Sequence, residues 1–141
     1  MTEKNEENLV AQKNPLTLAF IGDAYWTLQV REFLINKSGA KTGLLHNQCN
    51  EYVNAKSQSE FFQTIKDSLS ETEKNIAGRA RNAYNNTVPK HCTLAEYKQA
   101  TAFEAVIGYN YLTQNWARLD NIKQEIFFSQ KQSGACANEE G

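Results

Sequence analysis

Hydrophobic positions recur at spacings of three and four through most of the chain, and strict alternation of apolar and polar residues is scarce. Spacings of three and four gather apolar side chains on one face of an α-helix, whereas alternation is typical of strands. Only two Pro and seven Gly interrupt the 141 residues. The pattern therefore predicts an all-α fold, and the length suits one domain with a substantial core.

Start and stop signals along this pattern predict five helices. Asn14 and Pro15 are typical of a helix start and the run NKSGAKTG of a helix end, so the first helix is expected over 15–37. A second helical stretch covers 44–66, with a bend near 55–57. Ser70 and Glu73 have the spacing of a capping box that opens a third helix, which ends near RNAYNNTVPKH. Two further helices are expected at 94–111 and 116–129.

The two ends of the chain differ from its centre. Residues 1–13 are polar and acidic, which indicates an N-terminal extension, and residues 131–141 lose the apolar period and are expected to be a disordered tail. Residues 14–130 form the predicted domain. The N-terminal segment lacks the basic start and apolar core of a signal peptide, and no window is apolar enough to span a bilayer. We expect a cytoplasmic protein that makes no membrane contact.

Composition narrows the chemistry only slightly. Fifteen basic and sixteen acidic residues give a formal net charge of −1, which neither requires nor excludes nucleic-acid binding. The three Cys residues lack CxxC spacing, which disfavours both a disulfide scaffold and a zinc site, and they are interpreted as reduced thiols. His46 and His91 have no second ligand four residues away, so neither is favoured as a metal ligand or general base.

Two strongly apolar helical stretches each carry one acid. In LAFIGDAYWTLQV, residues 18–30, Asp23 follows Gly22 on a helix that is apolar nearly all round, which is typical of a buried central helix. In TAFEAVIGYNYL, residues 101–112, Glu104 lies among apolar residues with Gly108 nearby. An ionised carboxylate in such a place is unfavourable unless a cation or several donors compensate it. Small residues let helices approach closely, so the two acids are predicted to converge.

Paired carboxylates with no Lys or Arg on the same helix faces suit a hard divalent cation such as Mg²⁺, which takes oxygen ligands. The structural alternative is that each acid hydrogen-bonds a helix terminus or pairs with an arginine from elsewhere in the fold, with Arg31 and Arg118 as candidates. The pattern alone leaves both interpretations open.

Positions 75–95 contain no acidic residue, yet they include Arg79, Arg81, Asn82 and Lys90 among further Asn and Thr residues. Cationic and amide side chains are what contacts to nucleic-acid phosphates require. A helix end with cations placed favourably at its dipole explains Arg79 and Arg81 nearly as well. Beside a divalent-cation site this basic window favours nucleic-acid binding, because phosphodiester hydrolysis uses both.

Four runs in this order, AFIGDAYW, NAKSQSEFF, RARNAYNNTVPK and TAFEAVIGYNYL, resemble the ribonuclease III catalytic domain and its short Mini-III branch over about residues 14–130. The resemblance implies a homodimeric all-α helical bundle that cleaves double-stranded RNA with Mg²⁺ and leaves 5′-phosphate and 3′-hydroxyl ends. It places Asp23 and Glu104 on the catalytic, metal-binding acids of the family. For the Mini-III branch it implies 23S ribosomal RNA precursor as the substrate.

The chain departs from classical ribonuclease III at Leu16, Ala19 and Thr101, where relatives carry further acids. Fewer carboxylates imply a metal shell completed by water, backbone oxygens or RNA phosphate, and weak metal binding until RNA arrives. Without a second RNA-binding domain, the basic window and Lys56 become the expected contacts to the duplex. The alternative is a catalytically inactive ribonuclease-III-like RNA-binding module of a ribosome maturation complex, against which the retention of both acids argues.

Overall fold

The computed structural model describes residues 3–37, 39, 41–83 and 90–128. Within these residues the chain forms helices and no strand, which confirms the predicted all-α fold. The α-helices are α1 Glu3–Ala11, α2 Pro15–Lys37, α3 Thr42–Val53, α4 Ala55–Ile65, α5 Glu71–Asn82, α6 Leu94–Leu112 and α7 Trp116–Lys123. A 3-10 turn, Lys66–Ser68, follows α4, and a π-helical turn, Gln124–Phe128, follows α7.

Side-chain caps account for several helix starts. Asn14 Oδ1 accepts a hydrogen bond at 2.9 Å from the N–H of Leu16, the second residue of α2, and α2 has the predicted bounds. Ser70 and Glu73 form both hydrogen bonds of the predicted capping box at the start of α5. Thr93 and Glu96 form a second capping box at the start of α6, which the sequence analysis did not identify.

The predicted stretch 44–66 is two helices, and the break lies where the bend was expected. Asn54 ends α3 and caps α4, because its side chain accepts a hydrogen bond from the N–H of Ser57 at 2.8 Å. The polar extension at the N-terminus contains α1, a helix that the sequence analysis did not predict and whose Val10 and Ala11 pack against the core. The predicted tail 131–141 lies outside the described residues.

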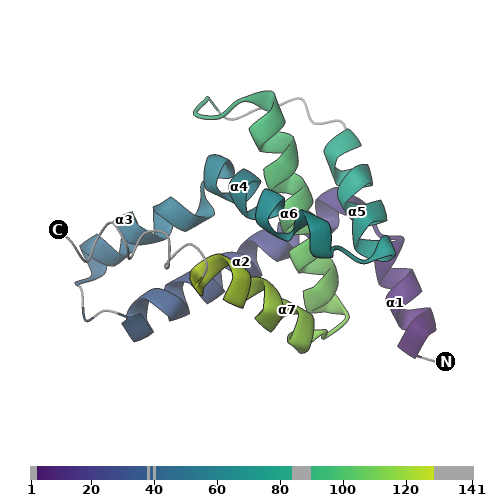
Figure 1. The fold of residues 1–141 in the computed structure, drawn as a ribbon, viewed down its shortest axis with the longest axis horizontal. Coiled ribbons are helices and arrows are strands. Elements are labelled where there is room, and N and C mark those ends of the chain that lie inside the picture. Colours follow the sequence, from purple (N-terminus) through teal and green to yellow (C-terminus); the bar gives the residue numbers. More distant parts are fainter. Residues whose placement is uncertain (1–2, 38, 40, 84–89, 129–141) are drawn as a thin grey trace.

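Helix α6 occupies the centre of the molecule, and α2, α4 and α5 pack against it (Figure 1). Nine residues of α6 are buried. The second half of α2 and helix α3 extend side by side away from this centre. Aromatic side chains fill the junction of three helices: the ring of Trp26 lies 5.0 Å from that of Phe103 and 5.7 Å from that of Phe61. The core therefore joins α2, α4 and α6.

Helices α2 and α6 cross at two glycines. A Cβ atom on Gly22 would lie 1.8 Å from the carbonyl oxygen of Glu104, and one on Gly108 would lie 1.9 Å from the carbonyl oxygen of Leu18. No side-chain carbon tolerates such distances, so only glycine permits this approach of the two backbones. The crossing fixes the relative position of the residues beside it, Asp23 on α2 and Glu104 on α6.

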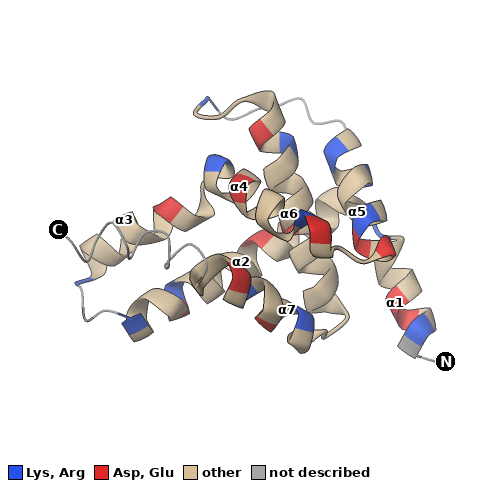
Figure 2. Cartoon of the chain, viewed as in Figure 1, with Lys and Arg blue, Asp and Glu red and all other residues tan. Residues whose placement is uncertain are grey.

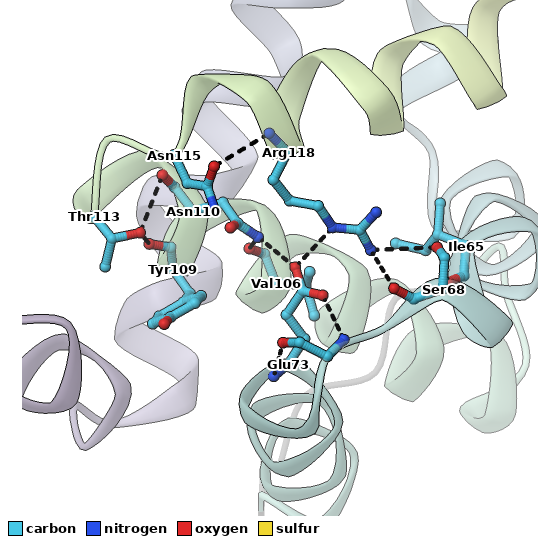
Figure 3. A network of polar contacts seen from close by, with 10 residues as sticks. Ile65, Ser68, Glu73, Val106, Tyr109, Asn110, Thr113, Asn115 and Arg118 are labelled. Atoms are coloured by element: carbon cyan, nitrogen blue, oxygen red, sulfur yellow. Dashed lines mark hydrogen bonds and ion pairs between the residues drawn. The ribbon is translucent and has the colours of Figure 1, made fainter. Parts of the chain in front are cut away.

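A buried polar network fastens α5 and α7 to α6 (Figure 3). Glu73, only 2% exposed, accepts hydrogen bonds from Asn110 Nδ2 at 2.7 Å and from Arg118 Nε at 3.0 Å. Burial alone would raise the pKa of Glu73, but hydrogen bonds from Arg118, the Ser70 N–H and Asn110, together with the Arg118 charge, lower it below its usual value. Arg118 is therefore engaged by Glu73.

Helix α2 is apolar on two sides, but the described structure covers only one of them. Trp26 and Val30 are buried, whereas Phe20 is 81% exposed and Leu28 and Ile35 are exposed as well. The prediction that this helix is buried all round is therefore wrong, and α6 is the central helix instead. No helix in the described part of the chain is long and apolar enough to cross a membrane.

Candidate functional site

The glycine crossing brings Asp23 and Glu104 together. Their carboxyl groups lie within reach of a side-chain hydrogen bond, which confirms the predicted convergence of the two acids. The predicted burial of Asp23 is wrong, because Asp23 is exposed while Glu104 is partly buried. Gly22 faces α6, and the next residue points about 100° further round the helix. The pair is thus open to solvent on its Asp23 side.

Burial, the hydrogen bond with Asp23 and the negative charge of Asp23 raise the pKa of Glu104 to about 9, and Gln58 acts weakly in the opposite direction. A carboxyl group with this pKa keeps its proton at neutral pH unless a cation replaces the proton. Neither Asp23 nor Glu104 forms an ion pair with a described residue, and this holds for Arg31 and for Arg118. The described structure therefore offers no support for the arginine-pairing alternative.

Two carboxyl groups that would repel each other if both were ionised fit a divalent cation, because the cation compensates both charges in place of the proton. Carboxylate oxygens are ligands that hard ions such as Mg²⁺ prefer. No group of three or more His, Cys, Asp or Glu in the described ranges could hold a metal ion. The protein would therefore supply two ligands, with water or substrate oxygens filling the remaining positions.

The positions where classical relatives carry further acids hold side chains without a carboxylate. Ala19 is buried and Leu16 is partly buried. The hydroxyl of Thr101, also buried, donates a hydrogen bond to the carbonyl oxygen of Tyr97 at 2.9 Å within α6. The two histidines, His46 and His91, are exposed. Among the described residues at this crossing, Asp23 and Glu104 are thus the acids that could bind a metal ion.

Basic residues occur near one end of each of the helices α4, α5 and α6. Figure 2 shows basic segments at the start of α4, in the last turns of α5 and in the first half of α6, together with acidic segments in α4 and in the first turn of α6. Lys56, Asn82 and Lys90 are exposed, and the guanidinium of Arg81 lies 5.5 Å from the centre of the Phe62 ring. The middle of the basic window, 84–89, lies outside the described residues.

Arg79, the other predicted RNA contact, has structural partners. Its guanidinium donates hydrogen bonds to the carbonyl oxygens of Ala11 and Lys13, and its Nε donates to Asn75 Oδ1 at 3.0 Å. These bonds satisfy carbonyls that the end of α1 leaves without helical partners. The structure therefore favours the structural interpretation at this arginine.

Gln58 of α4 lies next to the carboxylate pair and was not among the predicted site residues. Its side chain is 2% exposed and interacts with Glu104, yet its Nε2 has no hydrogen-bond partner among the described residues. Buried polar atoms without partners are rare in folded proteins, so each one calls for an explanation. No sequence signal identified this residue, because a polar position on an amphipathic helix is normally assigned to its solvent face.

Comparisons with known proteins agree on one family. The profile of the Ribonuclease III domain matches residues 16–115, which include both acids. The chain is 42% identical over 121 residues to a Mini-ribonuclease 3 of Thermoanaerobacter sp. (strain X514), covering 86% of this chain and 85% of that protein. It is 43% identical over 114 residues to a Mini-ribonuclease 3 of Brevibacillus brevis, covering 81% and 85%. A crystal structure of a Fusobacterium nucleatum protein is similar at 36% identity and a TM-score of 0.78, covering 84% and 95%.

Proposed function

The chain belongs to the Ribonuclease III domain family, and we propose that it is an endoribonuclease that cleaves double-stranded RNA with the help of a divalent cation. One observation carries the proposal. Asp23 and Glu104 meet at the glycine crossing, and neither forms an ion pair with a described residue. The pKa of Glu104 is raised to about 9. A pair of acids arranged at this free-energy cost is typical of a functional site.

Asp23 and Glu104 would hold Mg²⁺ through their carboxylate oxygens, with Glu104 in its deprotonated form. The ion, when bound, would supply charge stabilisation for an attacking water and for the departing 3′ oxygen. The overall reaction adds water across the phosphodiester: the water oxygen bonds to phosphorus and gives up a proton, the bond between phosphorus and the 3′ oxygen breaks, and the 3′ oxygen takes up a proton, which leaves a 5′-phosphate and a 3′-hydroxyl. Asp23, the exposed member, faces the substrate, and Glu104 anchors the site to the central helix.

The basic end of α4, α5 and α6 is the proposed contact surface for the RNA backbone. Lys56, Asn82 and Lys90 are exposed there, and Arg81 adds a further cation. Duplex RNA is recognised mainly through its shape and through phosphate and 2′-hydroxyl contacts, for which Lys, Arg and Asn donors are suited. Arg79 contributes positive charge, although much of its hydrogen-bonding capacity is used at the end of α1.

The exposed apolar face of α2 supports a homodimer. Phe20, Ala24, Leu28 and Ile35 are exposed and lie on one side of this helix. Several large apolar side chains exposed on one helix face, here with the exposed Arg31 among them, are typical of an interface. Asp23 lies on the same helix, so a dimer formed through this face would hold two carboxylate pairs near each other, as the cutting of both strands requires. We extend the proposal to 23S ribosomal RNA precursor as the substrate, on the resemblance to the Mini-III branch.

Cleavage of an end-labelled RNA duplex tests the proposed activity. We expect products only when Mg²⁺ or Mn²⁺ is present, none from a single strand of the same sequence, and 5′-phosphates on the new ends, which a ligase joins without prior kinase treatment. EDTA should abolish cleavage. Retention of the duplex in a gel without cleavage under any cation condition would contradict the proposal and favour an inactive RNA-binding module.

A further inference from the structure

Gln58 brings a third helix to the carboxylate pair. Helix α4 packs against α6, and two hydrogen bonds fix this contact beside Gln58, in the following turn of α4. Ser59 Oγ donates to Gln99 Oε1 at 3.2 Å, and Gln63 Nε2 donates to the same oxygen at 2.6 Å. The side chain of Gln58, 2% exposed, is therefore held at a defined place between α4 and α6.

The NH₂ group of Gln58 is a buried and unused donor close to Glu104. Nε2 has no hydrogen-bond partner among the described residues, and buried donors are rarely left without one in folded proteins. The side chains of Gln58 and Glu104 lie within reach of a hydrogen bond. A carboxylate offers only acceptor oxygens, so in this pair the NH₂ end of the amide is the group that can donate. Glu104 is therefore an acceptor that this unused donor can reach.

Resting on the proposed function, we infer that Gln58 is a positioning residue that orients the Glu104 carboxylate for the divalent cation. A hydrogen bond from Nε2 to one carboxylate oxygen of Glu104 would fix the orientation of that carboxylate and leave its other oxygen for the ion. Removing a residue that orients a metal ligand typically weakens metal binding by about 10–100-fold.

Two other roles of Gln58, contact with RNA and packing alone, predict different results. Direct contact with RNA needs exposed surface, and Gln58 has almost none. A purely structural role would change the unfolding midpoint and leave the affinity of the folded protein for a cation untouched. Cation affinity in the absence of RNA therefore separates positioning from packing.

Gln58→Met is the test variant, because it keeps the length of the side chain and removes both polar atoms. Gln48→Met is the matched control. Gln48 also carries a buried amide atom without a partner, its Oε1, but it belongs to α3, which packs against α2 and α4. Mn²⁺ binding to the RNA-free protein is measured from the electron paramagnetic resonance signal of free Mn²⁺, and single-turnover duplex cleavage is measured over a range of Mg²⁺ concentrations.

We expect Gln58→Met to raise the Kd for Mn²⁺ by about tenfold or more. Its cleavage rate should fall at limiting Mg²⁺ and recover at high Mg²⁺, while Gln48→Met matches the wild type in both assays. A Kd within twofold of the wild type, or equal losses in the two variants, would overturn the inference. Should Gln58→Met fail to fold, Gln58→Asn carries the test, because its amide ends one methylene short of Glu104 and the same loss is expected.

The wild type separates this inference from the function on which it rests. A wild-type protein that neither binds Mn²⁺ nor cleaves the duplex would refute the proposed function and the inference together. An active wild type beside a Gln58→Met variant with unchanged cation affinity would refute the inference alone.

Discussion

Replacing Glu104 by Gln is expected to stabilise the cation-free protein at alkaline pH. The pKa of Glu104 is about 9 in the folded chain against an ordinary value of 4.5. Between these two values the folded chain keeps a proton that the unfolded chain releases, so the free energy of unfolding of the wild type falls as pH rises through this window. The loss begins above pH 4.5 and ends near pH 9. Gln cannot ionise, so the variant lacks this dependence.

The size of the effect follows from the separation of the two pKa values. One pKa unit corresponds to about 1.4 kcal/mol, and pH 8 lies about 3.5 units above the unfolded value, so the cost to the wild type is at most about 5 kcal/mol. The site is open on its Asp23 side, and solvent screens part of the repulsion. We therefore expect Glu104→Gln to gain about 2–3 kcal/mol at pH 8 and less than about 1 kcal/mol at pH 5.

Urea denaturation in EDTA at pH 5, 6.5 and 8 measures this difference. The control is Glu60→Gln, which removes one negative charge at an exposed position of α4. Its free energy of unfolding should match that of the wild type at every pH. Added Mn²⁺ should stabilise the wild type more than Glu104→Gln, because ligand binding stabilises only a folded state that binds it. A gain that is the same at all three pH values, or a variant less stable than the wild type at pH 8, would refute the reasoning.

Three further substitutions test the rest of the structure. Gly22→Ala would place a methyl group 1.8 Å from the Glu104 carbonyl oxygen. We therefore expect the free energy of unfolding to fall by more than the roughly 1–3 kcal/mol of ordinary overpacking. A urea midpoint near that of the wild type would contradict the close crossing. Arg118→Met leaves the Glu73 charge buried and should cost about 3–5 kcal/mol at pH 7. Because the pKa of Glu73 is lowered, the difference in the free energy of unfolding between the wild type and Arg118→Met should shrink as pH falls below 4.5. Denaturation curves measure this difference, and a value that stays constant with pH would argue against the ion pair. Phe20→Glu should yield a folded monomer in sedimentation velocity, whereas a persistent dimer would exclude this face as the interface.

Elements whose ends are marked by local chemistry could be predicted from sequence. Asn14 and Ser70 cap their helices through side chains that lie within three residues of the N–H groups they accept from. Helix α1 could not be predicted in this way. Nine residues are too few for a stable isolated helix, and α1 is secured by contacts from far along the chain, among them the hydrogen bonds that Arg79 donates to Ala11 and Lys13.

The convergence of the two acids could be predicted from the sequence. Each of two apolar helices carries one acid with a glycine at most one turn away, which predicted that Asp23 and Glu104 converge. The exposure of Asp23 was not predictable, because apolar residues that face solvent, such as Phe20, give the same periodicity as apolar residues of the core. Gln58 was also hidden, since a buried amide without a partner can be recognised only when the packing around it is known.

Single-turnover cleavage of duplex RNA by the wild type, Asp23→Asn and Glu104→Gln tests most directly whether the two carboxylates perform the chemistry. Protein and Mg²⁺ are kept at saturating concentrations, and duplex binding is measured in parallel. We expect both variants to bind the duplex as the wild type does and to cleave it more slowly by a factor of about 100 or more, because each has lost an ion ligand. Equal cleavage rates in all three proteins would contradict the assignment of Asp23 and Glu104 as the catalytic pair.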